Sequence, residues 1–336
     1  MNIKSALNSL SEGKDLTKQD MLDAMNIIMS GEASAAQIGA FLMGLRVKGE
    51  TVEEIAAAVS ILREKMLPVK APDNAIDIVG TGGDGMGTLN ISTATAIVVA
   101  GADVPVAKHG NKALSSKSGS SEALQALGVK LDLDPKQISY CINQANIGFM
   151  FAPNHHLSMK YVGPVRAELG VRTMFNLLGP QSNPAGVKQY LLGVYDRQWV
   201  EPVASALLAN GATSAWVVHG SDGLDEITTT GKTFVTAIEN DSLRSFTISP
   251  KDAGLPIAEP KNLTGGDPKH NAVQLKLLLE GKKSPYRDIV LFNAAASFIV
   301  AGKVDNLKAG VALGEKIIDD GAALNTLEKL IEVSNS

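Results

Sequence analysis

The stretch Gly80-Thr81-Gly82-Gly83-Asp84-Gly85-Met86-Gly87 contains five glycines, and it lies between an apolar run, Ile76–Val79, and a run of small residues, Ser92–Ala100. We predict a strand from the first run and a helix from the second. Glycine tolerates positive φ angles and lets the backbone approach a ligand closely. The helix that follows offers its positive N-terminal end to an anion. The stretch therefore predicts a phosphate-binding loop, and the alternative is a tight strand–helix connection.

A dinucleotide-binding loop is a second interpretation, because Gly80, Gly82 and Gly85 fit the pattern G-x-G-x-x-G. Asp103 follows at a suitable distance, but it precedes the predicted strand Val104–Ala107, whereas the ribose-binding acid of that motif ends a strand. Asp84 would also repel a bare pyrophosphate. An acid in the loop suits a phosphate whose excess charge is neutralised by Mg²⁺, and we favour that interpretation.

The chain around this loop alternates between predicted strands and helices. Apolar runs predict further strands at Val104–Ala107, Ile147–Phe151, Tyr190–Val194 and Ser214–Val218. Helices are predicted at Ser92–Ala100, from Asp134-Pro135 to about Ala145, and at Val200–Leu208, and roughly the last 65 residues are predicted to be mostly helical. Alternation of this kind favours βαβ units and a mainly parallel sheet.

The first 66 residues have a different pattern, with only helices. Capping-box spacings at Ser34/Gln37 and Thr51/Glu54 mark the starts of two of about four short amphipathic helices. A unit of this size buries only a modest core by itself. We therefore expect it to pack on the rest of the chain, on a second copy, or on both.

A second polar motif, Lys108-His109-Gly110-Asn111-Lys112 followed by Ser115-Ser116-Lys117-Ser118-Gly119-Ser120, comes after the strand Val104–Ala107. Ligands of open α/β sheets bind at the carboxyl ends of strands. Three lysines and several hydroxyls at such an end suit a polyanion, and Ser120 heads a predicted helix near Glu122. A solvated polar loop is the alternative.

Adjacent carboxylates, Asp225-Glu226, close a third motif that begins at His219 after the strand Ser214–Val218. Carboxylates at a strand end suit a hard cation that keeps some of its waters. A polar turn explains this segment equally well when it is taken alone.

A fourth region contains His155-His156, Arg166 and a predicted turn at Leu178-Gly179-Pro180-Gln-Ser-Asn-Pro184. Neighbouring residues point in different directions, so we do not expect both histidines to bind one ion. Arg166 could hold a carboxylate with its planar fork, or it could be an ordinary ion-pair residue. Cys141 lies on an apolar helix and is predicted to be a core residue.

Composition narrows the classes of protein further. The chain has 336 residues, a formal net charge of −4 and one cysteine, with 32 glycines and 4% aromatic residues. A mildly acidic chain is a poor candidate for sequence-independent nucleic-acid binding. One cysteine excludes a disulfide framework. The apolar stretches are too short to span a membrane and no leader is recognisable, so we expect a cytoplasmic protein with no membrane or nucleic-acid partner.

Together, in this order, these segments resemble the anthranilate phosphoribosyltransferase family. Gly80–Asp84 with Asn90-Ile-Ser-Thr93 resembles its phosphoribosyl-pyrophosphate loop, Lys108–Asn111 its second signature, and Asp225-Glu226 its metal-binding pair. Lys112 stands where the family usually has Arg, and Leu157 where it has Pro or a small residue. Its C-terminal patterns are matched by Gly265-Gly-Asp-Pro268, Asn271-Ala272 and Asn293-Ala-Ala-Ala296.

The resemblance implies an α/β fold of the nucleoside phosphorylase/phosphoribosyltransferase type. A small N-terminal all-helical domain, residues 1–70, would serve dimerisation and be joined by a later segment near 166–185. Residues 71–336 would form a large α/β domain that has a mainly parallel sheet and carries the catalytic site. We therefore expect a homodimer.

The implied activity is transfer of the phosphoribosyl group to the amine of anthranilate, a step of tryptophan biosynthesis, with Mg²⁺ as cofactor, expected as two ions. No residue is expected to act as a covalent nucleophile or assigned acid or base. The residues that the resemblance assigns to phosphoribosyl pyrophosphate are Gly80, Thr81, Gly82, Gly83, Asp84, Thr88, Asn90, Ser92, Thr93, Lys108 and Ser120. Those assigned to anthranilate are Gly80, His109, Asn111, His156, Arg166, Gly179 and Pro180, and those assigned to metal are Ser92, Asp225 and Glu226.

Two alternatives share this architecture. A pyrimidine nucleoside phosphorylase would usually have Lys and Ser among the loop glycines, and the pair Asp225-Glu226 would not be expected. A non-catalytic nucleic-acid-binding relative would need a basic face, which a net charge of −4 does not favour.

Overall fold

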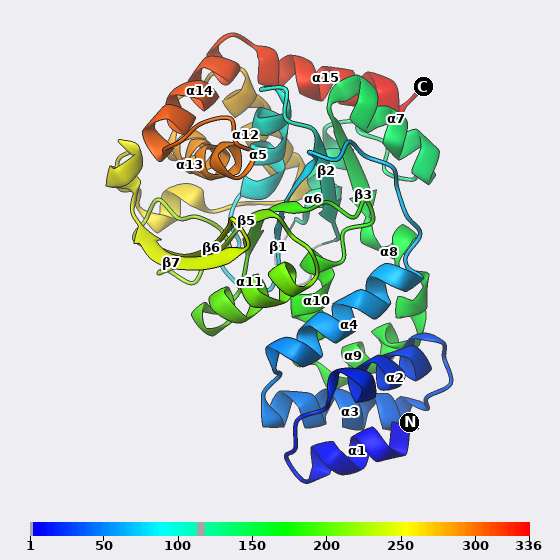
Figure 1. Cartoon of the computed structure of the whole chain (residues 1–336). Coiled ribbons are helices and arrows are strands. Elements are labelled where there is room, and N and C mark those ends of the chain that lie inside the picture. The colour runs from blue at the N-terminus through cyan, green and yellow to red at the C-terminus, as the bar shows by residue number, and fades with distance from the viewer. Residues whose placement is uncertain (1–2, 113–117) are drawn as a thin grey trace.

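A computed structural model describes residues 3–112 and 118–336. Four helices form an N-terminal bundle, as predicted: α1 (Ile3–Ser11), α2 (Lys18–Met29), α3 (Ala35–Lys48) and α4 (Val52–Lys65). Both predicted capping boxes are present, with Ser34 and Thr51 accepting from the backbone N–H groups of Gln37 and Glu54. Figure 1 shows the bundle at one end of the molecule and the C-terminal helix at the other.

A later part of the chain returns to this bundle. The 3₁₀ helix η1 (Leu157–Tyr161) packs on α2, α9 (Gly163–Leu169) on α3, and α10 (Phe175–Gln181) on α4. They follow the short helix α8 (Ala152–His155), and Figure 1 shows these green segments beside the blue bundle. The bundle thus contains two segments that are far apart in the sequence.

The turn predicted at Leu178–Pro184 is wrong in its first part, because α10 continues through Pro180 to Gln181 and the chain turns only after it. A proline inside a helix removes one hydrogen bond and usually breaks the helix. Here it falls in the last turn, where Gln181 Nε2 donates to Leu177 O and Ser182 Oγ donates to Leu178 O. Side chains therefore satisfy carbonyls that the ending helix leaves open.

The α/β part is built on a seven-stranded sheet of order β3-β2-β1-β4-β5-β6-β7. The strands are β1 (Ile76–Gly80), β2 (Val106–Gly110), β3 (Ile147–Phe151), β4 (Gln189–Gly193), β5 (Ser214–Gly220), β6 (Thr233–Glu239) and β7 (Ser242–Ile248). The first five are parallel, which confirms the mainly parallel sheet.

The last two strands form an antiparallel hairpin that the sequence analysis missed. Asn240 and Asp241 join them with φ angles of 50° and 57°. Two consecutive residues with positive φ are typical of the hairpin turn that matches the twist of the flanking strands, and Asn and Asp tolerate that conformation.

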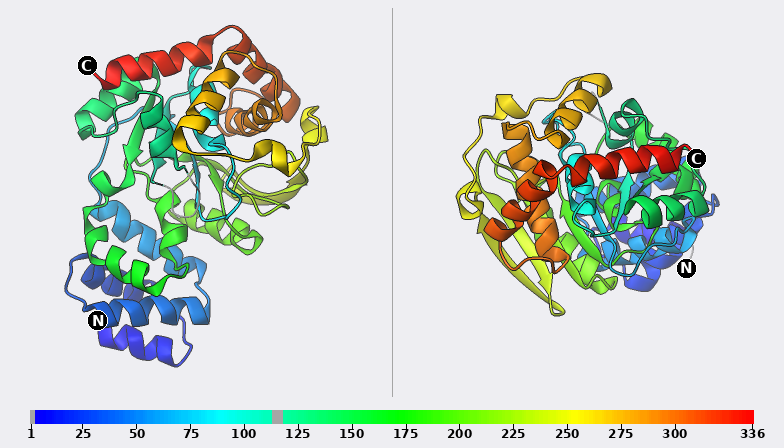
Figure 2. Two further views of the ribbon diagram at one scale, coloured as in Figure 1. Left: turned by 180° about the vertical axis from the view of Figure 1, so that it is seen from behind. Right: turned by 90° about the horizontal axis from the view of Figure 1, so that it is seen from above.

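Helices cover both faces of the sheet. On one face α5 (Ile91–Ala100) and α13 (Pro285–Val300) pack on β1 and β4, and α11 (Val200–Ala209) packs on β5 and β6 on the other (Figures 1 and 2). The remaining helices are α6 (Ser120–Ala126), α7 (Pro135–Ala145), η2 (Arg197–Trp199), η3 (Pro250–Ala253), η4 (Pro260–Leu263), α12 (Pro268–Leu279), α14 (Leu307–Asp319) and α15 (Ala322–Ser334).

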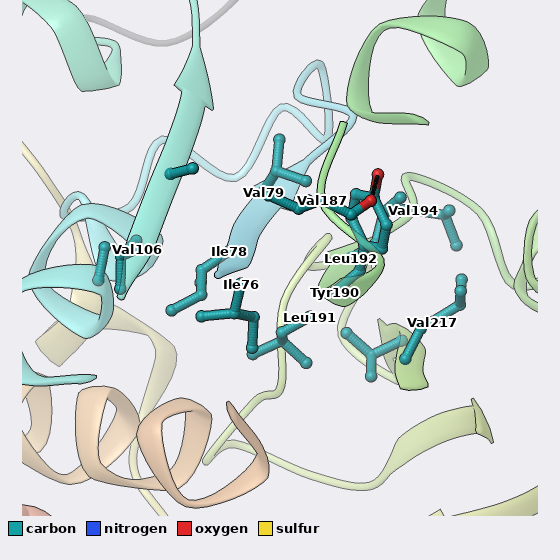
Figure 3. Close-up of a cluster of buried hydrophobic side chains, with 14 of the residues drawn as sticks. Ile76, Ile78, Val79, Val106, Val187, Tyr190, Leu191, Leu192, Val194 and Val217 are labelled. Atoms are coloured by element: carbon teal, nitrogen blue, oxygen red, sulfur yellow. Dashed lines mark hydrogen bonds between the residues drawn. The ribbon is translucent and has the colours of Figure 1, made fainter. Parts of the chain in front are cut away.

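The core lies at the centre of the sheet, where Ile76 and Ile78 of β1 pack near Leu191 of β4 (Figure 3). Arg63 of α4 connects this centre to the bundle. Its guanidinium donates to Gln181 O, to Asn210 O and to the Tyr190 hydroxyl. Cys141 is buried, as predicted.

Strand order reverses between β1 and β4. The chain moves from β1 through β2 to β3, and then crosses back to β4 on the other side of β1. Ligands of open α/β sheets bind outside the carboxyl ends of the strands at such a switch point. Gly80 and Gly193 are partners in register at this position. No helix within the described ranges is long and apolar enough to cross a membrane.

Candidate active site

Two adjoining cavities open at the carboxyl end of β1. The polar cavity, of about 180 Å³, lies between the glycine loop, the end of β2 and the pair Asp225-Glu226. The apolar cavity, of about 250 Å³, extends from the same strand ends towards α4, α8 and α10. Both are lined by Val79, Gly80, Thr81, His109, Gly110 and Asn111.

The predicted binding residues line these two cavities, and Gly80, His109 and Asn111 line both. Every residue assigned to anthranilate lines the apolar cavity: Gly80, His109, Asn111, His156, Arg166, Gly179 and Pro180. The polar cavity is lined by Gly80, Thr81, Gly82, Gly83, Asp84, Thr88, Asn90, Ser92, Lys108, Ser120, Asp225 and Glu226. Thr93 is the exception, because it is 1% exposed within α5 and lines neither cavity. Lys117 lies outside the described residues.

The glycine loop has the conformation that its composition allows. Gly82, Gly83, Gly85 and Gly87 all have positive φ angles between 60° and 75°. Gly82 N donates to Asp225 Oδ2 at 2.7 Å, which fastens the loop to the acid pair. A Cβ on Gly80 would lie 2.4 Å from the same oxygen, so glycine is required there by close approach.

Three carboxyl groups, those of Asp84, Asp225 and Glu226, line the polar cavity. Burial, followed by repulsion from the neighbouring Asp84, raises the pKa of Asp225 to about 7. Burial, followed by repulsion from Asp225, raises the pKa of Glu226 well above its usual value. Buried like charges of this kind favour the protonated form unless a cation is present.

These carboxylates fit a magnesium ion that shares its shell with a ligand. Glu226 Oε1 accepts from Ser92 N at 3.1 Å, whereas the buried Oε2 has no hydrogen-bond partner in the described structure. No cluster of three or more His, Cys, Asp or Glu side chains within residues 3–112 and 118–336 is placed to hold a metal alone. Mg²⁺ is usually held by one or two carboxylates plus phosphate oxygens and water, so this donor set fits.

The Lys108 side chain extends from β2 to the polar cavity, and a backbone carbonyl of β1 holds it. Its ammonium donates to Ile78 O at 2.5 Å, and burial lowers its pKa while Asp77, Glu226 and Asp225 oppose that change. Asp77 is fully buried on β1, where it accepts from His109 N and Asn183 Nδ2. Burial raises the pKa of Asp77 to about 6. Asp77 was missed from the sequence because it interrupts an apolar strand without any motif.

Arg166 brings a positive charge to the apolar cavity. Its Nη2 contacts Asn176 Oδ1 at 3.5 Å, and its guanidinium lies 5.5 Å from the centre of the Phe175 ring. Burial lowers the pKa of Arg166. Asn176 Oδ1 also accepts from Thr173 N at 3.0 Å, which fixes the acceptor beside the arginine.

Burial favours the neutral form of the histidines of the apolar cavity. The rings of His109 and His156 lie 5.2 Å apart, and burial lowers the pKa of both, that of His156 to about 4. His155 faces away, with Nδ1 within 2.9 Å of Leu67 O. The prediction that the two adjacent histidines do not share an ion is thus consistent with their different directions.

Further residues that shape the site carried no recognised signal. A Cβ on Gly193 would lie 1.5 Å from the backbone oxygen of Asp225. Arg172 Nη2 donates to Gly83 O, and its guanidinium lies 4.4 Å from the centre of the Tyr195 ring. Tyr286 donates its hydroxyl hydrogen to Asn90 O at 3.0 Å. Only a glycine at a strand end, Gly193, could have been found by its position.

Two protein-family models match the chain, and the boundary between them agrees with the boundary between the helical bundle and the α/β part. Residues 4–66 match the helical bundle domain of a glycosyl transferase family, and residues 72–324 match the α/β domain of that family. Two anthranilate phosphoribosyltransferases are each 58% identical to the chain. That of Bradyrhizobium sp. (strain ORS 278) aligns over 100% of this chain and 99% of its own length, and that of Rhodopseudomonas palustris (strain TIE-1) over 99% of both.

Solved structures of enzymes with this name share the whole fold. Anthranilate phosphoribosyltransferase from Thermus thermophilus superposes with a TM-score of 0.94 at 40% identity, covering 98% of this chain and 99% of its own. The Saccharomyces cerevisiae enzyme in complex with PRPP and Mg gives 0.92 at 31% identity, covering 99% and 98%. The chain therefore belongs to the anthranilate phosphoribosyltransferase family.

Proposed function

We propose that the protein transfers the 5-phosphoribosyl group of phosphoribosyl pyrophosphate to the amine of anthranilate, releasing pyrophosphate. The observation that carries this proposal is the meeting of a polar, glycine-lined cavity with an apolar, arginine-containing cavity at Gly80. The polar cavity suits a sugar that is phosphorylated at two positions, and the apolar cavity suits an aromatic carboxylate. The full-length similarity to enzymes of this name supports the same reaction.

The polar cavity would hold phosphoribosyl pyrophosphate. Gly80, Thr81, Gly82 and Gly83 of the loop would surround it, with Thr88, Asn90, Ser92, Lys108 and Ser120 as side-chain donors. The N-terminal end of α5 adds its dipole to these donors. Thr93 is left out of this set because its side chain is buried away from the cavity.

Asp225 and Glu226, with the Ser92 hydroxyl, would hold Mg²⁺, and we propose two ions because Asp84 adds a third carboxylate beside them. The Saccharomyces cerevisiae relative was solved with PRPP and Mg. When bound, the metal supplies positive charge to the departing pyrophosphate.

The apolar cavity would hold anthranilate, with Arg166 on its carboxylate and His109, His156, Gly179 and Pro180 around the ring. Asn111 lines both cavities and lies where the amine would meet the sugar. Neutral histidines leave Arg166 as the cation that recognises the carboxylate. The Saccharomyces cerevisiae relative was also solved with 4-fluoroanthranilate.

The reaction needs positioning more than acid–base catalysis. The aryl amine is uncharged at neutral pH, so its lone pair attacks C1′ directly while the bond from C1′ to pyrophosphate breaks. The proton that the new secondary amine sheds passes to solvent, and no residue is assigned to it. Holding amine and C1′ in line is the main contribution of the shared strand ends.

We also propose that the helical domain, residues 1–70 with the segment near 166–185, forms the contact of a homodimer, whereas residues 71–336 carry the site. The helical domain is small for an independent core, which supports a second contact. A cytoplasmic location stays a prediction.

The direct test compares the amount of pyrophosphate released with the amount of anthranilate consumed. Purified protein with anthranilate, phosphoribosyl pyrophosphate and Mg²⁺ should release one pyrophosphate for each anthranilate consumed. Release of pyrophosphate without consumption of anthranilate would show a different acceptor.

A further inference from the structure

The side chain of Asn90 does not have the capping role that its position at the start of α5 predicts. It is the N-cap residue of α5, and Asn at this position normally accepts a hydrogen bond from the first turn of the helix. Here the Asn90 side chain makes no such bond, and Ser92 N donates to Glu226 instead. The amide of Asn90 is therefore available for another role.

That amide belongs to a directed chain of hydrogen bonds. Gly266 N donates to Asn271 Oδ1 at 2.8 Å, Asn271 Nδ2 donates to Asn90 Oδ1 at 2.9 Å, and Asn90 Nδ2 donates to Ser118 O at 3.3 Å. A backbone N–H can only donate and a backbone C=O can only accept. Gly266 N at one end of the series and Ser118 O at the other therefore fix the same direction of hydrogen bonding. If either side-chain amide were reversed, a donor would face a donor or an acceptor would face an acceptor.

The segment before Gly266, the first donor of the series, is held against the glycine loop by backbone hydrogen bonds. Leu89 N donates to Leu263 O and Gly265 N donates to Gly87 O, so residues 263–265 pair with the end of the loop. A Cβ on Gly265 would lie 2.5 Å from Thr88 O, so this pairing requires glycine. Asn271 is 1% exposed on α12, and Tyr286 holds the backbone of Asn90 separately.

We propose that Asn271 is a positioning residue that orients the Asn90 amide with its nitrogen towards the polar cavity. An amide nitrogen carries two hydrogens, and Ser118 O takes one of them. The other is left for an oxygen of a phosphorylated sugar. With the opposite orientation Asn90 would present an acceptor to an anion, which repels it. This inference rests on the proposed function, since it assumes that phosphoribosyl pyrophosphate occupies the polar cavity.

Asn271→Asp removes the hydrogen-bond donor of Asn271 and adds a negative charge. An aspartate keeps the size and the acceptor for Gly266 N, but it cannot donate to Asn90 Oδ1. Binding of phosphoribosyl pyrophosphate with Mg²⁺, measured by titration calorimetry, should weaken about tenfold, the usual effect of one hydrogen bond to a charged group. The KM for anthranilate should change less than about twofold, because Asn271 acts only on the polar cavity. A dissociation constant equal to that of the wild type would overturn the proposal.

A double-mutant cycle separates orientation from the new negative charge. In the Asn90→Ala background, adding Asn271→Asp should change the dissociation constant less than about twofold, because the residue through which Asn271 acts is gone. An undiminished effect in that background would show that the charge acts directly, and the proposal would fail. Asn306→Asp is the matched control, since it caps α14 and Asp caps a helix as well as Asn does.

Thermal melting checks that the variant folds. If Asn271→Asp does not fold, Asn271→Ser, which is shorter and uncharged, is taken through the same cycle with the same expected coupling. Calorimetry needs no anthranilate. A wild-type protein that binds phosphoribosyl pyrophosphate but does not consume anthranilate would refute the proposed function, while the orientation of Asn90 would still be tested.

Discussion

Gly80 at the end of β1 and Gly193 at the end of β4 are partners in the parallel sheet, and Asp225 occupies the space that a side chain on either would need. The two glycines lie at the switch point of the sheet, where the strand order reverses. Their missing side chains let the acid pair approach the glycine loop, which places the carboxylates beside the phosphate donors.

Gly193→Ala should therefore damage the metal site. Its Cβ would lie 1.5 Å from Asp225 O, so the backbone of the acid pair must move. We expect at least a tenfold loss in kcat/KM, or about 1.4 kcal/mol, at saturating Mg²⁺. Gly163→Ala is the matched control, because a Cβ there meets nothing within 4 Å. Equal activity of the two variants would show that the close approach is unimportant.

Removing the charges of the acid pair should have opposite effects on stability and activity. Burial raises the pKa values of both residues, and repulsion from Asp84 on Asp225 and from Asp225 on Glu226 adds to this, so the charged forms destabilise the metal-free fold. Asp225→Asn with Glu226→Gln should raise the metal-free Tm by roughly 2 °C or more.

The same double variant should also require more Mg²⁺ for half-maximal activity, or lose activity. The exposed Glu201→Gln is its control. A Mg²⁺ profile unchanged from that of the wild type would remove Asp225 and Glu226 from the metal site.

Arg166→Ala should raise the KM for anthranilate more than the KM for phosphoribosyl pyrophosphate. Arg166 lines the apolar cavity only, and it is the cation beside neutral histidines. Loss of a charge-assisted hydrogen bond predicts about a tenfold change or more. Arg166→Lys should recover only part of this loss, because Lys lacks the planar fork. Equal increases in both KM values would contradict the carboxylate role.

The KM for anthranilate should not change with pH near the usual pKa of histidine. Burial lowers the pKa of His156 to about 4 and that of His109 well below its usual value, so the neutral forms are favoured. Both rings remain uncharged above these lowered values and gain a proton only below them. We expect a flat KM between about pH 6 and pH 9, and initial rates across this range would measure it. An inflection near pH 6.5 that His156→Asn abolishes would show a charged imidazole.

Much of the fold could be predicted because its signals are local. Capping boxes marked the starts of α3 and α4, and Asp134-Pro135 marked the start of α7. The hairpin of β6 and β7 was missed because its turn residues, Asn240-Asp241, have no glycine to mark them. Helix α10 was missed because Pro180 normally ends a helix, and the side-chain hydrogen bonds of Gln181 and Ser182 at the end of this helix are known only from the structure.

The site was predictable to the extent that its motifs are contiguous. The glycine loop and the pair Asp225-Glu226 were identified in sequence, and Thr93 was assigned through the family motif Asn90-Ile-Ser-Thr93. A helix turns 100° per residue, so Thr93 points into the core while Ser92 lines the cavity. Asn271 and Gly193 act through contacts with distant residues, and such contacts leave no pattern in one sequence.

The cavities that meet at Gly80 are proposed to join a phosphoribosyl group to anthranilate, and fluorescence provides the decisive measurement. The fluorescence of anthranilate is followed in the presence of phosphoribosyl pyrophosphate, with excess Mg²⁺ or with EDTA. We expect a complete, Mg²⁺-dependent loss of anthranilate fluorescence as the product forms. An unchanged signal at saturating phosphoribosyl pyrophosphate and Mg²⁺ would contradict the proposed reaction.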